Sequence, residues 1–213
     1  MSHTVSLEEK QHAYFQLRQV KSEFAAKGWF PATSGNLSMR VGEFGTEDDV
    51  IAITASGKDK SQQTAEDFLI VNKHGIATEH TSLKPSAETL IHCEIYRLTQ
   101  ARAIFHVHTV FNNLISELYA EQSSIPIEGV EIIKAFNIWD EDARIEIPVL
   151  PNYASIAQIV PLIQERIQLH IPGIVLRKHG VYAWGASTSE AQKHLEAFEF
   201  LFEYAYRWHM LHT

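Results

Sequence analysis

Short apolar runs recur along the chain and predict the strands of a sheet. The run 37–41, Leu-Ser-Met-Arg-Val, alternates apolar and polar positions, as expected for a strand with one buried face. The runs 69–71 and 76–78 flank a turn containing Gly75, which predicts a hairpin. Pro148 lies in the run 145–149, so we expect that strand at an edge or end of the sheet. Three further strands are predicted at 50–54, 103–108 and 174–178, and a polar turn with two glycines is predicted at 42–49.

Amphipathic stretches between these runs predict helices. A capping box, Ser6 with Glu9, opens a helix that reaches about residue 27 and ends at Gly28. Pro85 forbids helical continuation from before it, and Ser86 is a good N-cap, so a second helix is expected from Ser86 to about residue 98. Shorter helices are predicted over 110–119 and 155–169, and 125–136 is ambiguous.

A second capping box, at 187–190, starts a long C-terminal helix. This helix carries an apolar stripe at helical spacing, which predicts a contact with the core or with another subunit: Leu195, Phe198, Leu201, Phe202 and Ala205. Strands paired as hairpins and interleaved with helices predict an α/β protein with a largely antiparallel sheet covered by helices. With no repeat, low-complexity segment or linker, residues 1–213 are expected to form one domain.

Composition narrows the function classes. The 213 residues are 45% hydrophobic and 21% charged, which is typical of a soluble globular protein. The net charge of −8 provides no basic patch for nucleic acid, although backbone N–H groups can still bind a phosphate. The single cysteine, Cys93, cannot form an internal disulfide and fits a reducing compartment. No signal peptide and no run of roughly 20 apolar residues is found, so we expect a cytoplasmic protein without a membrane partner.

Three of the twelve histidines form a candidate metal site. His106 and His108 are two residues apart at the end of a predicted strand, so their side chains share one face about 6.6 Å apart along the chain. His179 ends another predicted strand and precedes Gly180. Three neutral nitrogen ligands with an open position are typical of catalytic zinc, and imidazole also accepts other divalent metals. The alternative is a pair of packed histidines, and solvated or packed roles are expected for most of the others.

Polar loops and two carboxylates supply further candidates. Loops of this composition can present N–H donors to a phosphate, although turns use the same residue types: Asn36, Ser56, Gly57, Lys58 and Ser86. Glu88 lies in the first turn of a predicted helix, where an acidic residue commonly stabilises the helix by interacting with its dipole. Glu131 stands in an apolar segment, where burial would raise its pKa and make it a general acid/base.

Taken together, these segments resemble the class II aldolase family over nearly the whole chain. The segments 33–38 and 54–57 resemble its two phosphate loops. The segment 85–88, followed by His92 and Tyr96, resembles its proline-serine-serine-glutamate helix, with Ala87 where a second serine is usual. His106, His108 and the His179-Gly180 pair match its zinc ligands. The resemblance implies a three-layer αβα sandwich around a mainly antiparallel sheet, one Zn²⁺ per subunit, and a homotetramer with active sites near subunit boundaries.

Within the family, 53–58, 131–134 and 177–185 most resemble its dehydratases. The resemblance implies dehydration of the ketose phosphate 5-methylthioribulose 1-phosphate to a 2,3-diketone in methionine salvage, with Glu131 as acid/base. Glu88, which matches the aldolase catalytic glutamate, is then a substrate or metal-site residue. A sugar-phosphate aldolase or 4-epimerase, and a non-catalytic module like the adducin head, are the alternatives. Three aromatic residues are candidates for gripping the methylthio group, although core packing is favoured for each: Phe136, Tyr182 and Trp184.

Overall fold

An eight-stranded sheet forms the centre of the computed structural model, which describes residues 5–42 and 49–212. The strand order is β3-β2-β1-β4-β8-β7-β6-β5, and β6 with β7 is the one parallel pair among these neighbours. The predicted, mainly antiparallel sheet is therefore confirmed. The strands are β1 Asn36–Val41, β2 Val50–Thr54, β3 Phe68–Asn72, β4 Ala103–Val107, β5 Ser124–Glu128, β6 Arg144–Leu150, β7 Gly173–Leu176 and β8 Gly180–Gly185.

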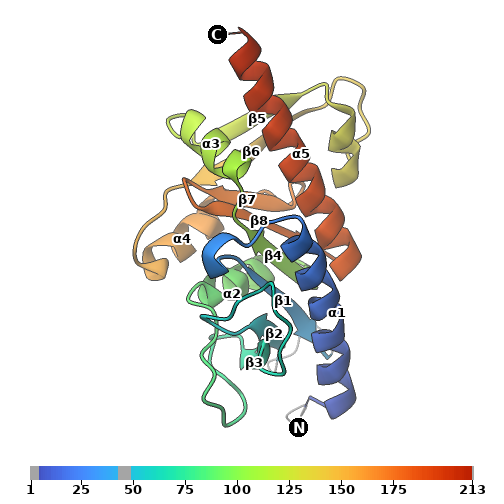
Figure 1. Ribbon diagram of the computed structural model, residues 1–213. Helices are drawn as coiled ribbons and strands as arrows, with labels where there is room; N and C mark the ends of the chain where they lie inside the picture. Colours follow the sequence, from blue (N-terminus) through green and yellow to red (C-terminus); the bar gives the residue numbers. More distant parts are fainter. Residues whose placement is uncertain (1–4, 43–48, 213) are drawn as a thin grey trace.

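Helices cover both faces of the sheet and complete the predicted αβα sandwich (Figure 1). In Figure 1, α1 and α5 lie on one side of the sheet, and α2 and α4 lie on the other. The helices are α1 Leu7–Ala26, α2 Thr89–Leu98, α3 Val110–Leu118, α4 Ile156–Arg166 and α5 Thr188–His212, with 3₁₀ turns η1 Pro31–Thr33 and η2 Glu131–Phe136. No helix within the described residues is both long and apolar enough to cross a membrane.

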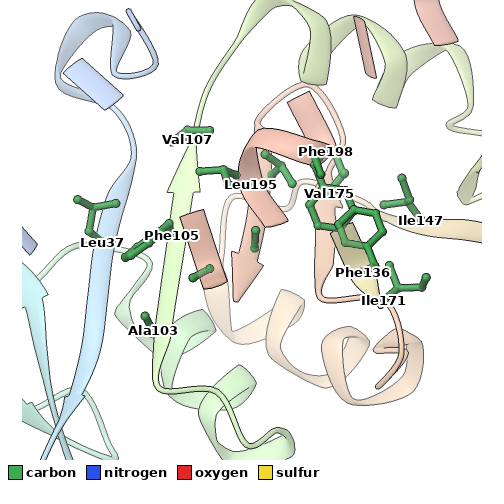
Figure 2. Close-up of a cluster of buried hydrophobic side chains, with 14 of the residues drawn as sticks. Leu37, Ala103, Phe105, Val107, Phe136, Ile147, Ile171, Val175, Leu195 and Phe198 are labelled. Carbon is green, nitrogen blue, oxygen red and sulfur yellow. The ribbon is translucent and has the colours of Figure 1, made fainter. Parts of the chain in front are cut away.

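Each face of the sheet has its own hydrophobic core, because side chains alternate along a strand. Ala103, Phe105 and Val107 of β4 join the core beneath α1 and α5, part of which is drawn in Figure 2. Ile104 joins the second core beneath α2 and α4. His106 is two residues from Ile104 and therefore faces the α2 side. This alternation decides which helix supplies the residues around the metal-site candidates.

The stripe on α5 is a core contact over most of its length. Leu195, Phe198, Leu201 and Phe202 are fully buried, and the Phe198 ring packs against the rings of Phe136 and Phe202. Beyond them, the C-terminal end of α5 projects past the sheet in Figure 1 and exposes large apolar side chains. These are Tyr204, Trp208, Met210 and Leu211.

Several local predictions are wrong. Residues 76–78 do not form a strand; Ala77 makes a single bridge to Val71, and Ile76 remains exposed. Strand β6 is not at an edge, because β5 and β7 flank it. Pro148 is tolerated there because it lies where the β5 pairing ends, one residue before the β7 pairing begins. The ambiguous segment divides into β5 and η2, and most of the predicted turn at 42–49 falls outside the described residues.

The start of α2 also differs from the prediction. Its N-cap is Glu88, not Ser86. Residues before it are held in extended form at the end of β2: Ser86 N–H donates to the Thr54 carbonyl at 3.2 Å, and Ala55 bridges Pro85. Because this pairing uses the backbone of Ser86, the helix begins later than expected, and Glu88 lies at its N-terminus.

Candidate metal centre

The three candidate histidines converge at one end of the sheet. His106 lies in β4, His108 directly follows that strand, and His179 lies in the β7–β8 turn rather than in a strand. The turn can approach β4 because it is followed by a glycine. A Cβ on Gly180 would stand 2.4 Å from the Val107 carbonyl oxygen and 2.7 Å from Cε1 of His106, so any other residue would push the turn away.

Glu88 joins the histidines as a fourth group. One ligand atom from each of Glu88, His106, His108 and His179 lies within 4.8 Å of all the others. The Nε2 atoms of His106 and His108 are 2.8 Å apart, and the Glu88 carboxylate lies 2.8 Å from Nε2 of His179 and 3.4 Å from Nε2 of His106. Three imidazole nitrogens and one carboxylate oxygen form a donor set that suits zinc and other divalent metals. The arrangement is compatible with a metal-ion site.

Outer contacts hold two of the imidazoles with Nε2 toward the cluster. Nδ1 of His106 lies 2.9 Å from the Val181 carbonyl oxygen, and Nδ1 of His179 lies 3.1 Å from Oδ1 of Asn152. Both partners are acceptors, so each Nδ1 carries a proton, and in the neutral ring each Nε2 would present its lone pair to a bound metal. The ring of Tyr182 stacks on His106 with centroids 3.9 Å apart. This pattern, with Nδ1–H bonded outward, is the one that metal-binding histidines use.

Burial keeps His106 and His108 in the neutral form that binds a metal. It lowers the pKa of His106 well below the ordinary histidine value and that of His108 to about 4, so both rings are neutral at pH 7. Burial by itself would raise the pKa of Glu88. Electrostatic attraction to His106 and His179, together with hydrogen bonds to His179 and Asn36, outweighs burial and holds the pKa of this carboxyl well below its usual range. Glu88 is therefore an anion.

The five loop residues that were expected to bind a phosphate differ in their burial and in their contacts. The Asn36 side chain points at Glu88 and donates to its carboxylate. Ser56 and Gly57 are exposed in a loop, and Ser86 lies beside Glu88, whose N–H donates to its hydroxyl at 3.4 Å. Lys58 donates to Glu66 at 2.7 Å. Asn36 thus belongs to the surroundings of the metal-site cluster.

A second lysine, which the sequence did not single out, is buried beside this site. Lys60 is 5% exposed, and its ammonium donates to the Thr33 carbonyl at 2.7 Å. Burial, then the charge of Lys21, lowers the pKa of Lys60 to about 8, while Glu88 opposes the shift. Next to Thr33, the buried hydroxyl of Ser34 has no hydrogen-bond partner among the described residues. A lysine in a Gly-Lys-Asp-Lys loop has no sequence pattern that predicts burial.

The loop that Lys60 contacts is strained. Ala32 and Thr33 have φ of 50° and 66°, in the left-handed region that β-branched residues such as threonine rarely adopt. The loop lies against β4, since a Cβ on Gly35 would stand 2.7 Å from the His106 carbonyl oxygen. Strain of this kind is found where surrounding structure holds a functional loop in place.

Glu131 does not have the burial that would raise its pKa in an apolar segment. Its side chain is 83% exposed in η2 and pairs with Lys134 at 2.8 Å. Its apolar neighbour Ile133 and, further along η2, Phe136 are buried in the core, and Glu131 is left on the outer side. It is not part of the metal-site cluster of its own chain. Phe136, Tyr182 and Trp184 are buried in the two cores, as expected for packing residues.

A buried carboxyl group on α5 holds the backbone that follows His108. Glu199 accepts from the Thr109 hydroxyl at 2.6 Å and from the Asn112 amide at 2.8 Å. Thr109 caps α3, and Asn113 on the same helix donates to the His179 carbonyl at 2.9 Å. The start of α3 therefore connects α5 to the segment that follows His108 and to the turn that carries His179.

Glu199 should make stability depend on pH. Burial raises its pKa from 4.5 to about 7, so the folded state holds an extra proton between these values and stability falls as pH rises through that window. The loss is roughly 3 kcal/mol above pH 7. Glu199→Gln lacks this loss, so its melting temperature relative to wild type should rise steadily from pH 5 to pH 8. A difference that is constant with pH would contradict the prediction.

Comparison with known proteins agrees with this geometry. The family model for the class II aldolase and adducin N-terminal domain matches residues 15–206. The chain is 49% identical to a methylthioribulose-1-phosphate dehydratase from Geobacillus sp. (strain WCH70), covering 92% of this chain and 91% of that protein. It is 46% identical to one from Persephonella marina, covering 96% and 94%. The structure resembles L-fuculose-1-phosphate aldolase from Thermus thermophilus, with a TM-score of 0.66, 28% identity and coverage of 93% and 95%.

Proposed function

The chain belongs to the class II aldolase and adducin N-terminal domain family, and on that premise we propose that it is a methylthioribulose-1-phosphate dehydratase, a hydro-lyase of methionine salvage. The observation that carries the proposal is the near full-length similarity to dehydratases of that name. The clustering of three histidines and Glu88 supports it, because the reaction needs an acidified proton next to a carbonyl. We further propose a cytoplasmic enzyme of one domain.

The reaction would convert 5-methylthioribulose 1-phosphate to 5-methylthio-2,3-dioxopentyl 1-phosphate and water. Zinc, held by His106, His108, His179 and Glu88, would supply a Lewis acid for the substrate's C2 carbonyl and C3 oxygen. We assign the proton transfers to Glu131. Its carboxylate takes the C3 proton, and the resulting acid returns a proton to the C4 hydroxyl, which leaves as water. The enol that remains tautomerises to the 2,3-diketone.

The exposure of Glu131 suggests where it acts. A side chain on the outer side of η2 can serve the active site of another copy, as in an oligomer whose sites lie at subunit boundaries. Apolar surface near η2 and along the end of α5 supports such assembly: Trp139 is 69% exposed and Trp208 is 54% exposed. We therefore propose a homotetramer in which Glu131 of one copy approaches the metal-site cluster of its neighbour.

We also place the substrate phosphate beside Lys60. Glu88, Asp59 and Asp67 favour the Lys60 ammonium, and a substrate phosphate would add an anion that balances this charge and that of a nearby divalent cation. The Ser34 hydroxyl, which has no partner within the described part of the chain, and the open loop at Gly57 would provide further donors. Lys58, Ser56 and Ser86 then lie at the outer margin of this subsite.

Lys60→Met should weaken phosphate recognition. Removing a charge-assisted hydrogen bond to a phosphate is expected to raise KM and the inhibition constant of inorganic phosphate by about 10- to 100-fold, with a smaller change in kcat. Steady-state kinetics with inorganic phosphate as a competitor measure both quantities.

Lys58→Met is the matched control, because Lys58 lies two residues away and already pairs with Glu66. Its kinetic constants should stay within a few-fold of wild type, given the small contribution of exposed ion pairs. If Lys60→Met lowers only the melting temperature, Lys60 merely supports the Thr33 loop and the phosphate subsite is wrong.

One assay tests the overall function. The purified protein is incubated with 5-methylthioribulose 1-phosphate, and the diketone is followed by trapping with a diamine. Release of dihydroxyacetone phosphate or glycolaldehyde phosphate would instead identify an aldolase. Absence of turnover together with no affinity for zinc would identify a non-catalytic module.

A further inference from the structure

A buried polar seam joins α2 to β1 behind the metal-site cluster. Glu88, His92 and Tyr96 recur every four residues and therefore share one face of the helix, rising about 6 Å per step. Asn36 and Ser38 are two residues apart on β1 and share one face of the strand, rising about 6.7 Å per step. The two spacings nearly match, so each helix residue meets a strand residue.

The contacts along the seam are continuous. The Tyr96 hydroxyl lies 2.9 Å from Oγ of Ser38, which lies 2.7 Å from Nδ1 of His92. Nε2 of His92 contacts Oδ1 of Asn36, and the amide nitrogen of Asn36 contacts the Glu88 carboxylate. The exposed fractions of Asn36, Ser38, His92 and Tyr96 lie between 0 and 4%. These side chains must therefore satisfy one another's donors and acceptors.

The charge on Glu88 sets the direction of every hydrogen bond. A carboxylate only accepts, so Asn36 must present its NH₂ group to Glu88 and its carbonyl oxygen to His92. That oxygen also only accepts, so Nε2 of His92 must carry the proton. Nδ1 is then a lone pair and receives the Ser38 hydroxyl. Ser38 in turn accepts from Tyr96, whose oxygen is also hydrogen-bonded by the Ile104 backbone. The neutral tautomer of His92 is thus fully specified.

We propose that His92 is a positioning residue that holds the Asn36 amide, and through it the Glu88 carboxylate, in the orientation needed to bind the metal. His92 is not one of the four residues of the metal-site cluster. It acts through Asn36: the Nε2–H of His92 binds the carbonyl oxygen of the Asn36 amide and so keeps the amide nitrogen directed at Glu88. The inference rests on the proposed metal centre but not on the identity of the substrate. A packing role is the alternative, since His92 also contacts the Tyr182 ring.

The test compares His92→Leu with His92→Gln. Leucine fills the space but donates nothing to Asn36, whereas the glutamine amide retains a donor close to the position of Nε2. Zn²⁺ affinity is measured by competition with a chromogenic chelator, and the Co²⁺ form is examined by its visible absorption spectrum. His92→Leu should lose about 10- to 100-fold in Zn²⁺ affinity, as is typical for partners of metal ligands, and its Co²⁺ spectrum should change. His92→Gln should recover most of both.

A second buried histidine supplies the control. His194 is 4% exposed and donates to the Trp184 carbonyl, outside the seam. His194→Leu should lower the melting temperature without changing Zn²⁺ affinity. If His92→Leu does not fold, Ser38→Ala tests the same point, because it removes the hydroxyl donor to Nδ1 that favours the Nε2–H form of His92, and it should weaken Zn²⁺ binding less, but in the same direction. Unchanged Zn²⁺ affinity in a folded seam variant, or equal losses in His92→Leu and His92→Gln, would overturn the proposal.

These measurements use the resting protein and the metal alone. A failure of the proposed dehydratase activity would therefore leave the result intact. Conversely, an active enzyme whose Zn²⁺ affinity ignores His92 would refute the positioning role and keep the function.

Discussion

Replacing His179 with alanine is expected to remove the bound metal and lower turnover by at least about 10³-fold, since a Lewis acid lowers the activation barrier by several kcal/mol. His179 is the most informative residue of the cluster to remove because it lies in the β7–β8 turn and is only partly buried. His106, by contrast, is fully buried under Tyr182, and its loss would also open a cavity. Elemental analysis and the diketone assay measure the two effects.

His170→Ala is the matched control for this prediction. His170 is an exposed histidine in the turn before β7, at the other end of the same strand. Its removal should leave metal content, melting temperature and turnover unchanged. If His179→Ala keeps one equivalent of tightly bound metal, the four-residue centre is wrong, and Glu88, His106 and His108 must suffice without it.

The sequence predicted most of the sheet because most of its strands are short apolar runs that end at polar turns. It missed β8, the strand between β4 and β7, because Gly180–Gly185 is buried throughout and shows no alternation. That omission also placed His179 at the end of a strand instead of in a hairpin. The pattern of strands and helices predicted a sheet covered by helices, and the three-layer αβα arrangement was implied by the family resemblance.

Residue spacing revealed part of the metal centre. His106 and His108 share a face by strand geometry alone, and this pairing is confirmed. The nearness of Glu88 depends on how α2 packs on β1, which no local pattern encodes. For the same reason no local pattern shows that the Asn36 amide faces Glu88, or that Lys60 is buried while Lys58 is half-buried. Partners that meet through helix-to-sheet packing require the structure.

The role of Glu131 needs a direct test, because its acid/base function is proposed from family resemblance while its side chain is exposed in its own chain. Glu131→Gln should keep the metal and lose about 10²- to 10⁴-fold in kcat, the usual contribution of a general acid/base. The change is nearly isosteric and lies on the surface, so the melting temperature should hold. Near-normal turnover would remove Glu131 from the mechanism. The neighbouring exposed Glu128→Gln, on β5, is the control and should be fully active.

Mixed oligomers decide whether Glu131 acts on its own chain or on a neighbour. Subunits carrying Glu131→Gln retain all four metal-site residues, and subunits carrying His179→Ala retain Glu131. If the site is shared, co-expressing these two inactive variants should restore turnover, because an intact metal centre can then meet an intact Glu131 from the adjacent copy. With random assembly of equal amounts, about a quarter of the sites are complete. Mixed oligomers that form but stay inactive would place both groups in one chain, and η2 would then have to move to bring Glu131 to its own metal centre.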